Sequence, residues 1–270
     1  MSNSQSTKLS RRTIVQGLVC GGAFLATPSI VRVSDAYAAT KTYEIAHAKV
    51  TIEYVRKGGG LTYVNLHGNE TTSVAAARAV IKKRGGTLMI LRHGGKRNVT
   101  FTYAGKQYAF DPNRMFTDKG IEASLRKLSK AWTPEAHIEV KNIAESIIKD
   151  FGLRSPKGGM VVALHNNTNG GGLTIKSYKK GGGIYRTEAT EMYENPARDP
   201  DDFFLVTSSR LFGSLKQKKF NVALHASRGF QDDGSLSVFC VQNGISYVNV
   251  EAENSHLNEQ IKMLEALHGV

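Results

Sequence analysis

The stretch Leu66-His67-Gly68-Asn69-Glu70 stands where an apolar, strand-like run (61–66) gives way to an alanine-rich helical run (73–83). A His and a Glu three residues apart point to opposite faces of a strand but share one face of a helical turn. A chain that passes directly from strand to helix here can aim the His67 imidazole and the Glu70 carboxylate at one point. Such a pair is half of the ligand set of a zinc site.

Strand-like and helical patterns alternate along the rest of the chain. Residues 43–55 indicate an opening hairpin or edge strand, and residues 99–110 indicate a hairpin around Ala104-Gly105-Lys106. Further strands are expected at 87–91, 160–164, 203–206, 222–224 and 245–250, and helices at 118–130, 134–151 and 255–267. This alternation predicts a single α/β domain with a mixed, largely parallel sheet and helices on both faces.

In such a sheet, functional groups gather at the carboxyl ends of the strands. A hydrolytic zinc site takes three protein ligands and leaves one position open. His165 follows the strand at 160–164 as His67 follows the first strand, and it is the expected third ligand, with His225 as the alternative. A carboxylate must also move protons, and Glu251 and Glu253, at or just after the strand at 245–250, are the candidates.

Residues 1–38 have the features of a twin-arginine-type signal peptide. The arginine pair lies in Ser10-Arg11-Arg12-Thr13-Ile14-Val15, and Ala36-Tyr37-Ala38 is the small-x-small pattern that a signal peptidase reads. The apolar run between them is shorter than the roughly 20 residues of a membrane span and contains Pro28. We therefore expect cleavage near Ala38, a periplasmic location and a mature domain of residues 39–270 without a stable membrane span.

The composition narrows the range of partners. The formal net charge is +13, and removal of residues 1–38 takes away four basic residues and one acidic residue, which leaves +10. This charge favours attraction to anionic partners such as cell-wall polymers or carboxylate substrates. Nucleic acid is not expected, because no basic motif with interleaved aromatic residues appears. Only Cys240 follows residue 38, so no internal disulfide is expected, and its apolar neighbours favour a buried side chain.

Three stretches together resemble a known family. His67-Gly68-Asn69-Glu70 resembles the HxxE zinc motif of the zinc carboxypeptidase superfamily and, more closely, the HGNE form of its succinylglutamate desuccinylase/aspartoacylase branch. Asp111-Pro112-Asn113-Arg114-Met115-Phe116 resembles the D-x-N-R-M-F element of that branch, and Ala163-Leu164-His165-Asn166 stands where its second histidine ligand is expected. The likeness covers about residues 61–172, with a fainter echo at 247–253. Pro112 and the sequence around the catalytic glutamate depart from the pattern.

The resemblance implies a zinc carboxypeptidase-like fold and one Zn²⁺ ion as the cofactor. His67, Glu70 and His165 would bind this ion. Asp111 would accept the free N–H of His67, which fixes the tautomer of a ligating imidazole.

The same resemblance implies roles in substrate binding and catalysis. Asn113 and Arg114 would hold a substrate carboxylate, a task that suits the guanidinium fork. Glu251 would be the general base and acid, and Glu253 is its alternative. An upstream arginine would polarise the substrate carbonyl; Arg97 is the candidate by its spacing.

Arg92 is the alternative to Arg97 as the arginine that polarises the substrate carbonyl. The expected activity is that of an exported zinc metallohydrolase that cleaves an amide or peptide bond next to a substrate carboxylate. A small peptide, such as a peptidoglycan stem peptide, and an N-acyl amino acid are the two candidate substrates. The alternative is a catalytically silent periplasmic binding protein that retains the fold.

Two further segments carry expectations. The Gly- and Asn-rich segment 166–183 is expected to form a flexible flap over the site. Asp199, Asp201 and Asp202 flank Pro200 and are expected to form a solvated turn.

Overall fold

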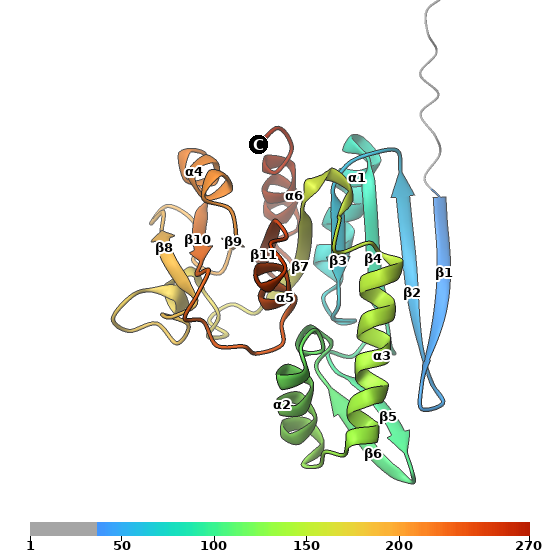
Figure 1. The fold of residues 1–270 in the computed structure, drawn as a ribbon. Coiled ribbons are helices and arrows are strands. Elements are labelled where there is room, and N and C mark those ends of the chain that lie inside the picture. The colour runs from blue at the N-terminus through green and yellow to red at the C-terminus, as the bar shows by residue number, and fades with distance from the viewer. Residues whose placement is uncertain (1–36) are drawn as a thin grey trace, which may run out of the picture. The chain divides into compact units, whose positions relative to one another are not determined.

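The computed structural model describes residues 37–270, which form an α/β domain around a nine-stranded sheet (Figure 1). The strand order is β1-β2-β4-β3-β7-β11-β9-β10-β8. These strands are β1 (Tyr37–Ile45), β2 (Ala48–Lys57), β3 (Thr62–Asn65), β4 (Gly86–Arg92), β7 (Val161–Asn167), β8 (Ala189–Tyr193), β9 (Phe203–Val206), β10 (Asn221–His225) and β11 (Tyr247–Glu253). A separate two-stranded sheet consists of β5 (Val99–Tyr103) and β6 (Lys106–Phe110).

The helices of the described residues alternate with these strands. They are α1 (Thr71–Arg84), α2 (Asp118–Ser129), α3 (Pro134–Asp150), α4 (Ser209–Gln217), α5 (Leu236–Gln242) and α6 (Leu257–Ala266). Short 3₁₀ turns are η1 (Pro112–Arg114), η2 (Lys157–Gly159) and η3 (Ile175–Tyr178). The expected α/β class is therefore confirmed.

The nine-stranded sheet is mixed, as expected, but parallel pairs do not dominate it. Within residues 37–270, the pairs β3-β4, β3-β7, β7-β11 and β9-β10 are parallel. The pairs β1-β2, β2-β4, β9-β11 and β8-β10 are antiparallel. The prediction of a largely parallel sheet holds only for the four central strands, because β2 and β9 run antiparallel to β4 and β11, and the edge strands β1 and β8 pair antiparallel with β2 and β10. The central strands β4, β3, β7 and β11 are mutually parallel, so their carboxyl ends meet at one edge.

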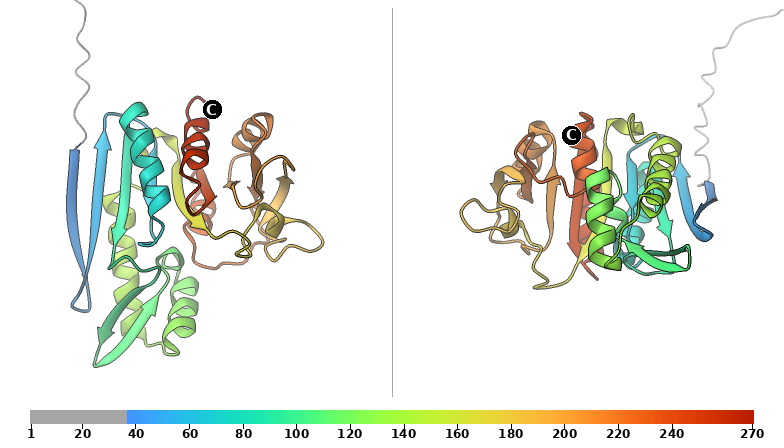
Figure 2. Two further views of the ribbon diagram at one scale, coloured as in Figure 1. Left: turned by 180° about the vertical axis from the view of Figure 1, so that it is seen from behind. Right: turned by 60° about the horizontal axis from the view of Figure 1, so that its bottom comes forward.

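Helices cover both faces of the sheet, as predicted. In Figure 1, α3 lies in front of the sheet, and α1 and α6 come to the front in the reversed view of Figure 2. Side chains of each strand alternate between the two layers. In β4, Met89 and Leu91 pack with α2, α3 and α5, whereas Leu88 and Ile90 pack with α1, α4 and α6. The strands are thus buried on both faces, which explains their nearly continuous apolar sequences.

The structure contains three elements that were not predicted from the sequence. The strand β8 and the helix α4 lie in the segment after residue 183, and α5 occupies an apolar run that contains Cys240. Cys240 itself is buried, as expected, and burial raises the pKa of its thiol to about 12. Two predicted strands are also longer than expected, since β7 and β11 continue past His165 and Glu251.

Two expectations about loops are corrected. The segment 166–183 does not form a free flap along its whole length, because Ile175 and Tyr178 are buried in a cluster with Phe203. The solvated turn is wrong as well: Asp201 and Asp202 are buried. Asp201 accepts a hydrogen bond from the Gly170 backbone, and Asp202 accepts one from the backbone of Glu253.

The expected signal peptide lies outside the described residues except for its last two positions. Within residues 37–270, no helix has the length and apolar character needed to cross a membrane.

A close backbone contact joins α2 to the loop before α5. A Cβ atom at Gly120 would lie 2.2 Å from the Cα of Gly234 and 2.7 Å from the carbonyl oxygen of Arg114. We predict that Gly120→Ala lowers the free energy of unfolding by about 1–3 kcal/mol, because the backbone must move apart. Gly213→Ala in α4 is the matched control: its Cβ meets nothing within 4 Å, so a gain of about 0.5–1 kcal/mol is expected. Urea denaturation measures both, and equal effects would contradict this contact.

Candidate metal centre

A cavity of about 310 Å³ lies at the carboxyl ends of the central strands. The segment after β3, the ends of β7 and β11, and the turn η1 all contribute to its walls. It brings together all but one of the predicted site residues: His67, Glu70, Arg97, Asn113, Arg114, His165 and Glu251. The remaining one, Asp111, contacts His67 from behind.

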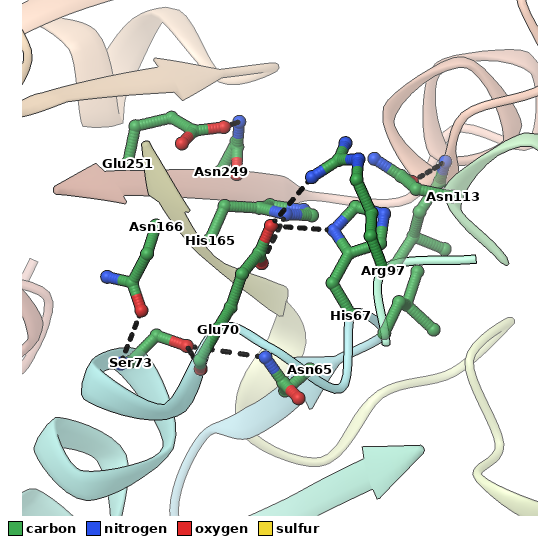
Figure 3. A network of polar contacts seen from close by, with 12 residues as sticks. Asn65, His67, Glu70, Ser73, Arg97, Asn113, His165, Asn166, Asn249 and Glu251 are labelled. Carbon is green, nitrogen blue, oxygen red and sulfur yellow. Dashed lines mark hydrogen bonds and ion pairs between the residues drawn. The ribbon is translucent and has the colours of Figure 1, made fainter. Parts of the chain in front are cut away.

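The side chains of His67, Glu70 and His165 converge on one point (Figure 3). Each is buried, and one ligand atom from each lies within 4.8 Å of the others. The Nδ1 atom of His67 lies 2.8 Å from one Glu70 oxygen, and the Nδ1 atom of His165 lies 3.1 Å from the other. The two imidazole rings are 5.2 Å apart between centroids. These three residues therefore form a group that could bind a metal ion.

The donor set fits a tetrahedral ion. Ligand atoms about 2.0–2.1 Å from a tetrahedral zinc lie roughly 3.3 Å from each other. The observed separations of 2.8 and 3.1 Å are shorter by only a few tenths of an ångström.

The local backbone explains why Glu70 can serve this site. Glu70 is the N-cap residue of α1, yet its carboxylate makes no capping hydrogen bond. Its backbone N–H instead donates to the carbonyl of His67, and Ser73 Oγ donates to the carbonyl of Glu70. Asn166, next to His165, accepts from the Ser73 backbone N–H. This network ties the start of α1 to the end of β7.

Gly68 brings a second loop to the same point. Its N–H donates to the carbonyl of Lys96, and a Cβ atom here would lie 3.0 Å from that oxygen. The close approach places Arg97 beside the metal group, where it donates to Glu70 at 3.1 Å and to Asp111 at 3.5 Å. Arg92, the alternative, instead pairs with Glu53 outside the cavity. Of these two arginines, only Arg97 lines the cavity.

Asp111 occupies the position that was expected of it. Its Oδ1 lies 2.8 Å from the Nε2 of His67, on the side of the ring away from Glu70. Its backbone N–H donates to Ser124 of α2, which holds the carboxylate in place. His165 has no equivalent partner, since its Nε2 is buried and makes no hydrogen bond with another residue of the described chain.

These contacts set the charges of the group. Burial disfavours a charged His67, but hydrogen bonds with Asp111 and Glu70 outweigh it and raise the pKa of His67 to about 9. Burial would likewise raise the pKa of Glu70, but His165 and His67 lower it to about 2. The pKa of Asp111 is also lowered, since His67 and Arg97 outweigh its burial. The positive charge of a protonated His67 is thus stabilised between the carboxylates of Glu70 and Asp111.

The two alternatives of the sequence analysis lie elsewhere. His225 ends β10, and its Nδ1 contacts the carbonyl of Ala226 rather than the metal group. Glu253 lies 3.5 Å from His256 and does not line the cavity. Glu251 does line it, because it is in register with His165 on the neighbouring parallel strand.

Glu251 is a buried carboxylate with one hydrogen bond, from Asn249 Nδ2 at 3.1 Å. Burial raises its pKa; the charge of His165 opposes this effect, and that of Glu70 adds to it. Tyr247, Asn249 and Glu251 alternate along β11 and all face the cavity. Glu251 is therefore a cavity-facing carboxylate whose pKa lies above its ordinary value.

Asn113 and Arg114 lie in η1, at the cavity wall. The Asn113 amide oxygen accepts from the backbone N–H of Leu236, so only its NH₂ group is free to donate into the cavity. The guanidinium of Arg114 donates to the Asn113 carbonyl and lies 3.3 Å from a carboxylate oxygen of Asp233. The pairing of Arg114 with an acidic residue was not expected.

Several other residues of the cavity were not predicted from the sequence, among them five with polar side chains. Tyr178, Tyr185, Glu188, Asp233 and Asn249 all line it. Tyr178 lies within the glycine-rich segment, Tyr185 and Glu188 follow it, and Asp233 lies in an irregular loop, so no periodic pattern marks their direction. Only Asn249 could have been found, because it lies two residues before Glu251 on a predicted strand.

Comparison with known proteins adds no family assignment. No protein-family model matches the chain, and no curated protein matches it significantly.

The raised pKa of His67 predicts how metal affinity depends on pH. At pH 7, below the pKa of about 9, His67 carries protons on both nitrogens. A metal ion needs the Nδ1 lone pair, so binding must release that proton. Zinc affinity should therefore rise with pH toward that pKa, by up to about tenfold per unit.

Competition with a zinc chelator between about pH 6 and pH 8 measures this dependence. Asp111→Asn is the matched variant. It removes a charge that stabilises the protonated ring, so a shallower dependence is expected. An affinity for zinc that stays constant over this range would argue against His67 as a ligand.

Proposed function

We propose that this chain is an exported zinc-dependent hydrolase that cleaves an amide or peptide bond next to a substrate carboxylate. We further propose that it belongs to the zinc carboxypeptidase superfamily, closest to the succinylglutamate desuccinylase/aspartoacylase branch. One observation carries the proposal: the metal group of His67, Glu70 and His165 shares a single cavity with Glu251 and Arg114. The ordered motifs that resemble that branch contribute all of these residues except Glu251, which lies in the fainter echo at 247–253.

Zinc held by His67, Glu70 and His165 would act as a Lewis acid and lower the pKa of a bound water. Glu251, buried beside His165, would accept a proton from the attacking water and deliver it to the leaving nitrogen. Its raised pKa suits both steps, since the group must take up a proton and give it back.

Two arginines would position the substrate. Arg114 and the free NH₂ group of Asn113 would bind the carboxylate, and Asp233 would have to yield part of its contact with Arg114. Arg97 lies against Glu70 with half of its side chain exposed, so its guanidinium can reach a carbonyl oxygen beside the metal. Arg97 also contacts Asp111, which caps the turn that carries Asn113 and Arg114, so both arginines would act from the same part of the cavity wall.

The location is part of the proposal and rests on the sequence of residues 1–38. The arginine pair and the Ala36-Tyr37-Ala38 pattern support export through the twin-arginine route and cleavage near Ala38. In a periplasm, peptidoglycan stem peptides and N-acyl amino acids are the two substrate classes that offer a carboxylate next to an amide.

We predict that Glu251→Gln lowers kcat by about 100- to 10,000-fold while the zinc content stays unchanged. The reason is that the amide keeps the shape of the side chain but cannot accept the proton. Glu253→Gln is the matched control: it lies on the same strand but outside the cavity, so turnover should persist.

Mass spectrometry of muropeptides and N-acyl amino acids reports turnover, and metal analysis reports zinc. A fully active Glu251→Gln variant would overturn the assigned base. Zinc-loaded protein that turns over no member of the panel would support a catalytically silent binding protein instead.

A further inference from the structure

The charges that line the cavity do not balance. Four carboxylates face it, from Glu70, Glu188, Asp233 and Glu251, against the guanidinium groups of Arg97 and Arg114 and the protonated imidazole of His67. Arg97 contacts Glu70, and Arg114 contacts Asp233. Glu251 receives its hydrogen bond from Asn249. The Glu188 carboxylate alone has neither a hydrogen bond nor an ion pair with any side chain or backbone group in residues 37–270.

The backbone at Glu188 is nevertheless firmly held. Its N–H donates to the carbonyl of Tyr185, and its carbonyl accepts from the N–H of Ala226 at 2.8 Å. The next residue begins β8, at the edge of the large sheet. The carboxylate is thus placed in the cavity by two fixed segments rather than by a loose loop.

This placement costs free energy in the absence of a partner. Burial raises the pKa of Glu188 to about 7; Asp233 adds to the effect, and Arg114 opposes it. A half-buried carboxylate near another carboxylate is unfavourable unless a cation compensates it. Such groups are concentrated at binding sites, where the ligand supplies the missing partner.

The wall beside Glu188 has a second feature of a cation site. Tyr178 and Tyr185 both line the cavity, with ring centroids 5.7 Å apart. Tyr178 is 5% exposed, and its hydroxyl makes no hydrogen bond with the described residues although it borders the cavity. Tyrosine rings attract an ammonium group through their faces, and a hydroxyl oxygen can accept from it.

We propose that the substrate residue bound here carries an ammonium group as well as a carboxylate, and that Glu188 binds the ammonium beside Tyr178 and Tyr185. This inference rests on the proposed function. Arg114 would bind the carboxylate, and Asp233 links the two regions because it contacts Arg114. In the proposed hydrolase, the α-nitrogen of the substrate residue that carries the carboxylate is part of the scissile amide, so it has no charge. The ammonium must therefore be on the side chain, so the substrate class is a residue of a diamino acid.

Matched substrates test the proposal with the zinc-loaded full chain. N-acetyl-lysine and N-acetyl-norleucine, and the dipeptides alanyl-lysine and alanyl-norleucine, differ only in the terminal amine. Both configurations of the last residue are included. We expect kcat/KM to favour the lysine compounds by about tenfold or more, as for a close charge pair.

Glu188→Gln should reduce this preference to less than about twofold, because the neutral amide cannot pair with the ammonium. Glu191→Gln is the matched control, since Glu191 lies on β8 but is exposed and outside the cavity; it should keep the preference. Equal rates for lysine and norleucine compounds in the unmodified protein would overturn the inference. So would a preference that survives Glu188→Gln.

Calorimetry of free lysine and free norleucine separates this inference from the proposed function. If no amide is cleaved but lysine binds more tightly in a manner that requires Glu188, the hydrolase proposal fails and the ammonium site stands. If amides are cleaved without regard to the amine, the hydrolase stands and the ammonium site fails.

Discussion

The site depends on one buried carboxylate. Glu70 lies between the imidazoles of His67 and His165, with one oxygen toward each Nδ1. A charge buried to this extent is tolerated only when its partners are fixed in place. The fold provides this in two ways: Asp111 holds the far side of His67, and the Ser73–Asn166 hydrogen bond joins the helix that follows Glu70 to the strand that carries His165. These contacts hold the three side chains of the metal group together.

The arrangement of strands explains how distant segments reach this carboxylate. The central strands β3, β7 and β11 are parallel, so their carboxyl ends bring His67, His165 and Glu251 to one edge of the sheet. The small unit of β5, β6 and α2 adds Asp111 and Arg114 from below this edge (Figure 1). The remaining wall comes from the segment between β7 and β8, which includes Glu188, from Leu205 of β9 and from the loop before α5. The metal group and the proposed substrate contacts thus come from different parts of the sheet.

Much of the metal group could be predicted because each of its residues lies at or just after the end of a strongly apolar strand. The apolar run shows where such a strand ends, and parallel strands bring these ends to one edge of the sheet. His67, Glu70 and His165 are brought together as expected, and Asp111 contacts His67 as expected. The rest depends on tertiary contacts. The apolar run around Cys240 is not assigned to any element from the sequence alone, and it forms α5 because Ser235 caps this helix and Asn113 accepts from its first N–H. Glu188 follows a glycine-rich segment without periodicity, and the antiparallel direction of β9 is set by loops rather than by its own residues.

X-ray absorption at the zinc edge tests the central claim most directly. For the zinc-loaded full chain, the account predicts one zinc per chain with two imidazole nitrogens at about 2.0–2.1 Å, oxygen in the remaining positions and no sulfur. His165→Gln should remove one imidazole from the spectrum, and His225→Gln, outside the metal group, should leave it unchanged. A chain that does not retain zinc, or a spectrum in which His165→Gln removes no imidazole, would contradict the claim that these residues share one ion.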